Sequence, residues 1–152
     1  MLQETKLNKD EGPRLEKKLR SWNLHLQDPR GASGGLGIIW NTRKVILNII
    51  KSRHSWISSK IKIIKSNLQF ILINIYGLIQ NSDKKVLWDE ISSFINEYSN
   101  EIILLGGDFN SILNLVKKVG GLQKISPASI DFKNWVESNY LVDIPTNNGK
   151  FM

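Results

Sequence analysis

Residues 69–76 form the stretch of sequence that most constrains the fold. They read Gln-Phe-Ile-Leu-Ile-Asn-Ile-Tyr and are almost continuously apolar. They lack the alternation of polar and apolar residues that is typical of a strand with one solvent-exposed face. A short run with this β-branched content predicts a strand that is covered on both faces. Together with the helical patterns elsewhere in the chain, it favours a layered α/β domain with a mixed sheet.

Five further strands are predicted from short apolar, β-branched or alternating runs. In residues 57–63, isoleucine or serine alternates with serine or lysine, which is typical of a half-buried strand. Residues 101–105 are apolar except for Glu101 and lead directly into a Gly-Gly-Asp-Phe-Asn segment, so we expect a buried strand there. The other three strands are predicted at 36–40, 45–50 and 141–144.

Three helices are predicted from apolar residues that recur at helical spacing. Leu15, Leu19 and Trp22 share one face of the first, over 12–22, and the second covers 83–98, with Asn81 or Ser82 as its N-cap. The third begins at Ser126-Pro127, a cap followed by proline, and runs to about residue 139. Glycine and proline predict a loop at 28–35.

The length and composition indicate a single globular domain, or part of one, over residues 1–152. The 152 residues are 41% hydrophobic and 23% charged, and they include no cysteine, which excludes disulfides, thiolate zinc sites and a cysteine nucleophile. No apolar run is long enough for a transmembrane helix, and the first residues do not form a secretory signal. Residues 147–150 are typical of a hairpin turn that needs a following strand, so we expect the domain to be incomplete at both ends.

The net charge of +7 and the pI of about 9.7 favour polyanionic partners. The lysines are spread along the chain rather than clustered, so charge alone favours a solvated lysine-rich surface over nucleic-acid binding.

Asp108 and Asn110 are the most informative candidates for a functional site. They follow a predicted buried strand and two glycines, and residues i and i+2 of an extended segment point the same way. A carboxylate and an amide at the carboxyl end of a strand suit a hard divalent cation and a phosphate oxygen. Because Asp, Asn and Gly also form turns, a purely structural turn is the alternative.

Four other residues are weaker candidates. Tyr76 ends the 69–76 strand and is placed either to contact a phosphate or only to cover the sheet edge. By position alone, Glu4 is a surface glutamate near the N-terminus. His25, which we expect in a loop, and His54, near a strand start, have no carboxylate at a spacing typical of a catalytic site.

Three ordered motifs resemble the endonuclease/exonuclease/phosphatase superfamily, and the closest resemblance is to the endonuclease domain of plant LINE-type retrotransposons. The motifs are Leu2-Gln3-Glu4-Thr5-Lys6, Asn74-Ile75-Tyr76-Gly77 and Gly106-Gly107-Asp108-Phe109-Asn110. This resemblance extends over nearly the whole chain. It implies a two-sheet β-sandwich flanked by helices (four layers, α/β/β/α), of which this chain would hold an incomplete copy.

The resemblance also implies a DNA endonuclease that uses Mg²⁺ or Mn²⁺. Glu4 would be a metal ligand, Tyr76 would contact the scissile phosphate, Asp108 would position or activate the attacking water, and Asn110 would bind the phosphate or the metal shell. Full-length relatives carry a fused reverse transcriptase and act on DNA, with the nucleus as the expected location. No membrane partner is implied.

The chain departs from the family pattern in two functional positions. It contains neither the asparagine that precedes Gln-Glu-Thr in relatives nor their C-terminal Ser-Asp-His segment. We therefore expect weak or absent catalysis by the isolated chain. A non-catalytic nucleic-acid-binding remnant and a decayed transposon fragment are the alternatives.

Overall fold

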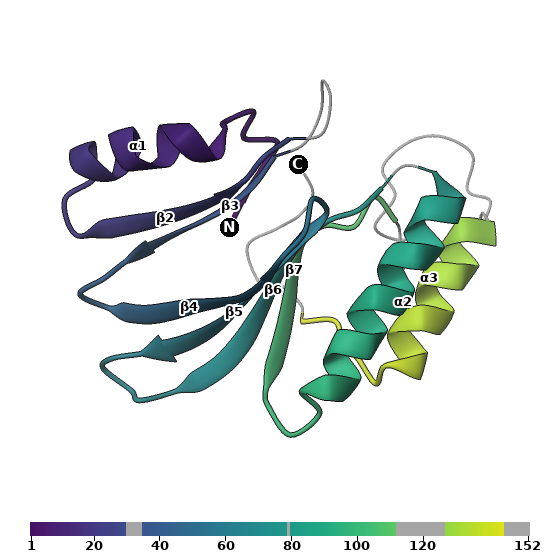
Figure 1. Cartoon of the computed structure of the whole chain (residues 1–152). Coiled ribbons are helices and arrows are strands. Elements are labelled where there is room, and N and C mark those ends of the chain that lie inside the picture. The colour runs from purple at the N-terminus through teal and green to yellow at the C-terminus, as the bar shows by residue number, and fades with distance from the viewer. Residues whose placement is uncertain (30–34, 79, 112–126, 145–152) are drawn as a thin grey trace.

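The computed structural model describes residues 1–29, 35–78, 80–111 and 127–144, which form two β-sheets with helices outside them (Figure 1). Most of the predicted 28–35 loop, Ser126 and the predicted turn at 147–150 lie outside these residues. In chain order the elements are β1 (Leu2–Gln3), η1 (Lys9–Glu11), α1 (Gly12–Lys18), β2 (Trp22–Gln27), β3 (Leu36–Asn41), β4 (Val45–Ser52), β5 (Trp56–Ile63), β6 (Gln69–Tyr76), α2 (Asn81–Glu97), β7 (Ile103–Asp108) and α3 (Pro127–Ser138).

The strands form a three-stranded sheet in the order β1-β3-β2 and a four-stranded sheet in the order β4-β5-β6-β7. All described pairs are antiparallel except β6 and β7, which are parallel and are connected through α2. The predicted α/β class with a mixed sheet is therefore confirmed. As Figure 1 shows, α1 lies outside the smaller sheet, and α2 and α3 lie side by side next to the larger one.

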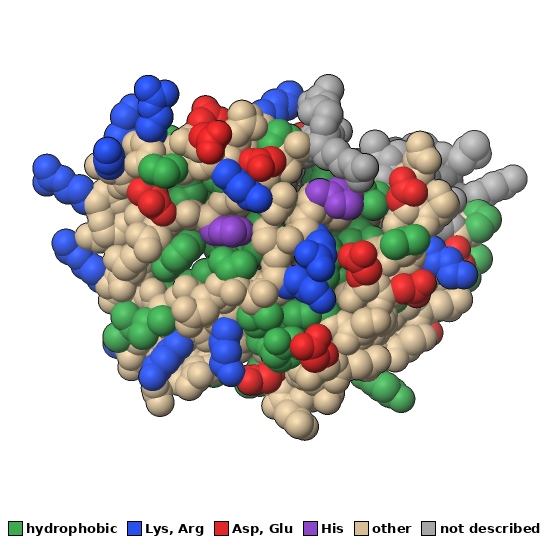
Figure 2. Space-filling view, viewed as in Figure 1, with side chains coloured by type: hydrophobic (Ala, Val, Ile, Leu, Met, Phe, Trp, Pro, Cys, Tyr) green, Lys and Arg blue, Asp and Glu red, His purple; other side chains and the backbone are tan. Residues whose placement is uncertain are grey.

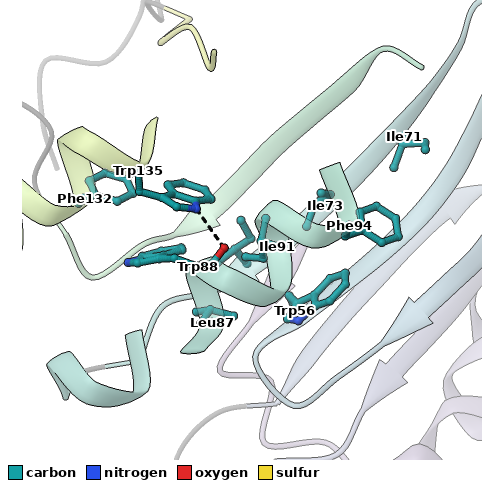
Figure 3. Packing of buried hydrophobic residues seen from close by; sticks show 10 residues of the cluster. Trp56, Ile71, Ile73, Leu87, Trp88, Ile91, Phe94, Phe132 and Trp135 are labelled. Carbon is teal, nitrogen blue, oxygen red and sulfur yellow. Dashed lines mark hydrogen bonds between the residues drawn. The ribbon is translucent and has the colours of Figure 1, made fainter. Parts of the chain in front are cut away.

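The larger of two buried cores lies between the four-stranded sheet and helices α2 and α3. Ile71, Ile73 and Ile75 of β6 are fully buried and face this core, and Trp135 donates its indole N–H to the Trp88 carbonyl at 3.1 Å (Figure 3). The helical side of the core is formed by Leu87, Trp88, Ile91, Phe94, Phe132 and Trp135.

The smaller core lies between the two sheets. Leu36 and Ile38 of β3 pack with Ile57 of β5, and all three are buried. Alternate residues of β6 face the helices while Asn74 and Tyr76 face the smaller sheet, so the prediction that residues 69–76 are covered on both faces is confirmed.

The N-terminal part of the chain corrects two predictions. The first helix ends at Lys18 rather than at 22, and Trp22 and His25 lie in β2, where His25 was predicted to be in a loop. Ser21 has a φ of 66°, and the Trp22 N–H donates to the Leu19 carbonyl at 2.8 Å, which closes a tight turn. The apolar spacing of Leu15, Leu19 and Trp22 continued the helix pattern, but pairing with β3 determines the structure beyond Leu19.

Strand and helix ends provide further corrections. The first helical turn of α2 includes residues 81 and 82, its N-cap is Gln80, and no side chain caps it. The strand predicted at 101–105 lies at 103–108, so it includes both glycines, and Ile102 and Leu104 are exposed rather than buried.

Two more predictions about strands are wrong in part or in full. In β5, Ser58 is as buried as Ile57 and Ser59, because the first half of the strand is covered on both faces rather than half-buried. The 141–144 segment is not a strand in the described structure. Its first residue, Leu141, instead donates its N–H to the Val136 carbonyl at 3.0 Å and so stays tied to the end of α3.

Candidate active site

Three segments that are distant in the sequence meet at the carboxyl ends of β6 and β7. Tyr76 is the last residue of β6 and lies opposite Asp108, the last residue of β7, in the parallel register. Glu4 directly follows β1, which belongs to the other sheet. The site is therefore formed where the rims of the two sheets come together.

Tyr76 and Glu4 are joined by a short hydrogen bond. The Tyr76 hydroxyl donates to Glu4 Oε1 at 2.6 Å. This hydrogen bond, with burial and the charges of Glu4 and Asp108, raises the pKa of Tyr76 above its usual value of 10.0. The phenol is therefore protonated at neutral pH and can donate a hydrogen bond to an anion that displaces Glu4.

Asp108 and Asn110 form a compact turn rather than a continued strand. Asn110 has a φ of 46°, and its backbone N–H donates to Asp108 Oδ1 at 2.9 Å. Its side-chain amide donates to the Gly77 carbonyl at 2.5 Å. The two side chains therefore do not project in parallel from an extended segment, as the i, i+2 argument predicted. Asn110 holds the turn, and the Asp108 carboxylate is exposed at its edge.

Lys84 of α2 also holds this turn through hydrogen bonds. It was not identified from the sequence as a candidate site residue. The residue is only 9% exposed, and its ammonium group donates to the Asn110 carbonyl at 2.5 Å and to Ser111 Oγ at 3.3 Å. Among the described residues it forms no ion pair with a carboxylate. Its helical spacing from Leu87 and Ile91 places it on the buried face of α2. That spacing is the feature of the sequence from which the burial of Lys84 could have been predicted.

Gln3 and Asn74 connect the two sheets below the site. Asn74 is fully buried, and its amide donates to the Leu2 and Gly37 carbonyls at 3.2 and 3.1 Å. Gln3 donates to the Ile75 carbonyl at 2.5 Å. These bonds hold β1, and hence Glu4, against β6. The single polar residue inside the apolar 69–76 run was the sequence signal for this role.

The two histidines have different positions relative to the site. His25 lies in β2 at 3.1 Å from Ser52 Oγ, where burial, and secondarily the charge of Lys9, lowers its pKa below 6.5. It is not part of the site. His54 is exposed at the end of the β4–β5 hairpin and borders a pocket that also contains Tyr76.

Gly107 allows the two sheets to approach at this point. It has a φ of 133°, and a Cβ atom there would clash with the Ile75 carbonyl and the Gln3 side chain. We expect Gly107→Ala to destabilise the domain by about 1–3 kcal/mol, because it combines backbone strain with overpacking. Gly12→Ala is the matched control, since a Cβ there meets open space. Urea unfolding of both variants checks this prediction, and equal midpoints would contradict it.

Comparison with known proteins identifies the fold through structure alone. No protein-family model matches the sequence, and no curated protein is a detectable relative. The structure is similar to humanized TDP2 of D. rerio (TM-score 0.50, 17% identity, over 72% of this chain and 47% of that chain). It is also similar to ANGEL2, a 2′,3′-cyclic phosphatase in complex with adenosine-2′,3′-vanadate (TM-score 0.50, 20% identity, over 73% and 39%).

The fold is similar to part of the endonuclease/exonuclease/phosphatase fold. The chain spans less than half the length of either structure, at 47% and 39%. The similarity is one of fold alone, and it shows neither membership of the superfamily, nor an origin in LINE endonucleases, nor the roles of individual residues. No helix in the described ranges has the length and apolar content needed to cross a bilayer.

The residues at the rim include some of the oxygen donors that a Mg²⁺ site needs. Glu4 and Asp108 both act electrostatically on Tyr76, so two carboxylates lie around one hydroxyl. Mg²⁺ is usually held by one or two carboxylates, water and substrate phosphate, so Glu4 fits as a ligand. The described residues contain no group of three or more His, Cys, Asp or Glu side chains that would form a protein-only site.

The hydrogen bond to Glu4 makes the ionisation of Tyr76 testable. Because its folded pKa is raised, the stability that this bond contributes is present below pH 10 and is lost as the pH rises through the folded value. Ultraviolet absorbance measures the formation of tyrosinate as the pH is raised. We expect Glu4→Ala to shift the phase of this titration that belongs to Tyr76 to lower pH. Tyr76→Phe should delete that same phase. An unchanged titration in Glu4→Ala would show that the bond is not formed in solution.

Proposed function

We propose that this chain carries part of the active site of a Mg²⁺-dependent phosphodiesterase that cuts DNA, as in the endonuclease domains of LINE-type retrotransposons. The observation that carries the proposal is the convergence of Glu4, Tyr76 and Asp108 at one rim. The fold similarity supports the phosphodiesterase class. The resemblance of the three ordered motifs supports the narrower assignment to DNA and to retrotransposons.

Each residue has a distinct role in the proposed hydrolysis. A water oxygen forms a bond to phosphorus while the bond to the leaving sugar oxygen breaks, and the leaving oxygen takes a proton from solvent. Asp108 accepts the proton of that water, since its carboxylate is exposed and held in place by the Asn110 N–H. The protonated Tyr76 hydroxyl donates to a non-bridging phosphate oxygen and stabilises its growing negative charge. Asn110 holds the turn, with Lys84 behind it.

Glu4 is the proposed ligand of the metal in this scheme. A bound Mg²⁺ supplies Lewis-acid stabilisation of the phosphate and lowers the pKa of a bound water. A fused reverse transcriptase and a nuclear location belong to the same proposal.

A second candidate function is nucleic-acid binding without catalysis. The net charge of +7 favours it, because lysine and arginine contacts to phosphates release counterions. Figure 2 shows the basic side chains spread over the visible face with acidic ones between them, rather than gathered in one patch. That distribution indicates weak, salt-sensitive binding and does not by itself indicate an active site.

Nicking of supercoiled plasmid by the purified chain separates the two functions. The phosphodiesterase proposal predicts slow conversion to open circles in Mg²⁺ and none in EDTA. Retarded plasmid mobility without open circles, in a chain whose circular dichroism shows folded structure, would support binding alone and contradict the proposal.

A further inference from the structure

A pocket of about 400 Å³ lies directly beside Tyr76. It is formed between the tip of the β4–β5 hairpin and the first half of α2. Its apolar wall includes Trp56, Leu78 and Leu87, and its polar residues include Arg53 and His54. Its size falls within the range of about 300–1,000 Å³ that is typical of small-molecule sites.

Ser55 is a buried residue of the pocket wall with an unsatisfied hydroxyl, a feature that it shares with Ser59 in the middle of β5. The residue is 2% exposed, lines the pocket, and its hydroxyl has no hydrogen-bond partner within the described structure. A buried polar group without a partner is uncommon in native proteins. The Ser55 carbonyl accepts the Tyr76 N–H at 2.8 Å, so the serine is fixed next to the proposed reaction centre.

The hairpin tip carries two exposed side chains that can donate hydrogen bonds to a phosphate, Arg53 and His54. The Arg53 N–H donates to the Trp56 carbonyl at 2.8 Å, which fixes the backbone there. A guanidinium suits a phosphate group because two of its N–H groups can donate to two phosphate oxygens. The tip therefore offers a phosphate two donor side chains in the same pocket as Tyr76.

The opposite side of the pocket carries negative charge. Asp83 and Glu90 line it, and the Trp56 indole N–H donates to Glu90 at 3.1 Å. These carboxylates disfavour a second phosphate and accept hydrogen bonds from sugar hydroxyls or base amino groups. The pocket thus has a cationic side, an apolar wall and an acceptor side, which matches a nucleotide with a single phosphate.

We propose that this pocket binds the nucleotide next to the cleaved phosphodiester. The phosphate of that nucleotide lies against Arg53 and His54, and its sugar and base lie along Leu78 and the exposed Val86. This assignment rests on the proposed function, because it places the cleaved phosphate at Tyr76. It makes Arg53 a phosphate contact that positions the substrate and adds to the four proposed site residues.

Binding of a short fluorescein-labelled DNA duplex in EDTA tests the pocket without requiring cleavage. The full chain, Arg53→Ala and Arg43→Ala are compared by fluorescence anisotropy over a range of salt concentrations. Both arginines are exposed, and Arg43 lies in the β3–β4 turn, outside the pocket. We expect Arg53→Ala to raise Kd about tenfold, as for loss of a charge-assisted contact. It should also reduce the slope of log K against log salt by about 1, the value for one phosphate contact.

The control variant makes each outcome decisive. Arg43→Ala should change Kd less than about twofold, as is usual for an exposed charge outside the contact. Equal effects of Arg53→Ala and Arg43→Ala would overturn the pocket assignment, because the arginines would then act only through net charge. A selective effect of Arg53→Ala in a chain that does not nick DNA would support the pocket and contradict the proposed catalysis.

Discussion

Asp108→Ala is expected to lower the rate of Mg²⁺-dependent nicking at least about 100-fold, the lower limit for loss of a general base. Its carboxylate is exposed and has one described hydrogen bond, to the Asn110 N–H. The fold should therefore persist while the proton acceptor is lost. Quantification of open-circle plasmid over time, at matched protein concentration, measures this effect.

Asp108→Asn separates the chemical role of Asp108 from its role in the turn. Asparagine keeps an oxygen that can accept the Asn110 N–H, but it does not take a proton from water. We expect a loss of activity similar to that of Asp108→Ala, with an unfolding midpoint like that of the wild type. If Asp108→Asn nicked within about threefold of the wild-type rate, the carboxylate would not be the base.

Trp88→Ala is expected to cause the largest loss of stability among single substitutions in the described core, about 3–5 kcal/mol. Trp88 is 6% exposed. The centroid of its ring lies 4.5 Å from the ring centroid of Trp135 and 5.3 Å from that of Phe132. It also stacks at 6.1 Å on Phe109, which lies between Asp108 and Asn110. The substitution should therefore weaken the core and loosen the site turn together.

Urea denaturation followed by circular dichroism measures this loss. Trp22→Ala is the matched control, because Trp22 is 41% exposed in β2 and its truncation should cost less than about 1 kcal/mol. Equal losses for the two tryptophans would show that the aromatic cluster around Trp88 does not form the main core.

Strands were predictable from the sequence where burial leaves a clear pattern. The 69–76 run was placed correctly because both of its faces are buried, and the parallel partner strand was found within about three residues. The β2 strand was missed, since Leu15, Leu19 and Trp22 continue a helical period that only pairing with β3 interrupts. Local periodicity contains no information about such a distant partner.

The four candidate site residues could be named from motifs, but their geometry could not. The motifs do not reveal that Glu4 accepts a hydrogen bond from the Tyr76 hydroxyl, because that contact spans 72 positions and depends on how two sheets meet. The direction of the Asn110 side chain was mispredicted for a similar reason, since its left-handed backbone ends the strand before the i, i+2 rule applies. Lys84 was missed because a lysine in a helix is usually solvated.

The central claim is that Glu4 and Asp108 belong to one catalytic unit, and a double-mutant cycle on nicking rates tests it most directly. Glu4→Ala, Asp108→Ala and the double variant are compared with the wild type under identical Mg²⁺ concentrations. We predict that each single variant loses most of the activity and that the double variant is no slower than the slower single one, because members of a unit are not additive. A Glu4→Ala variant that nicks at the wild-type rate would contradict the claim.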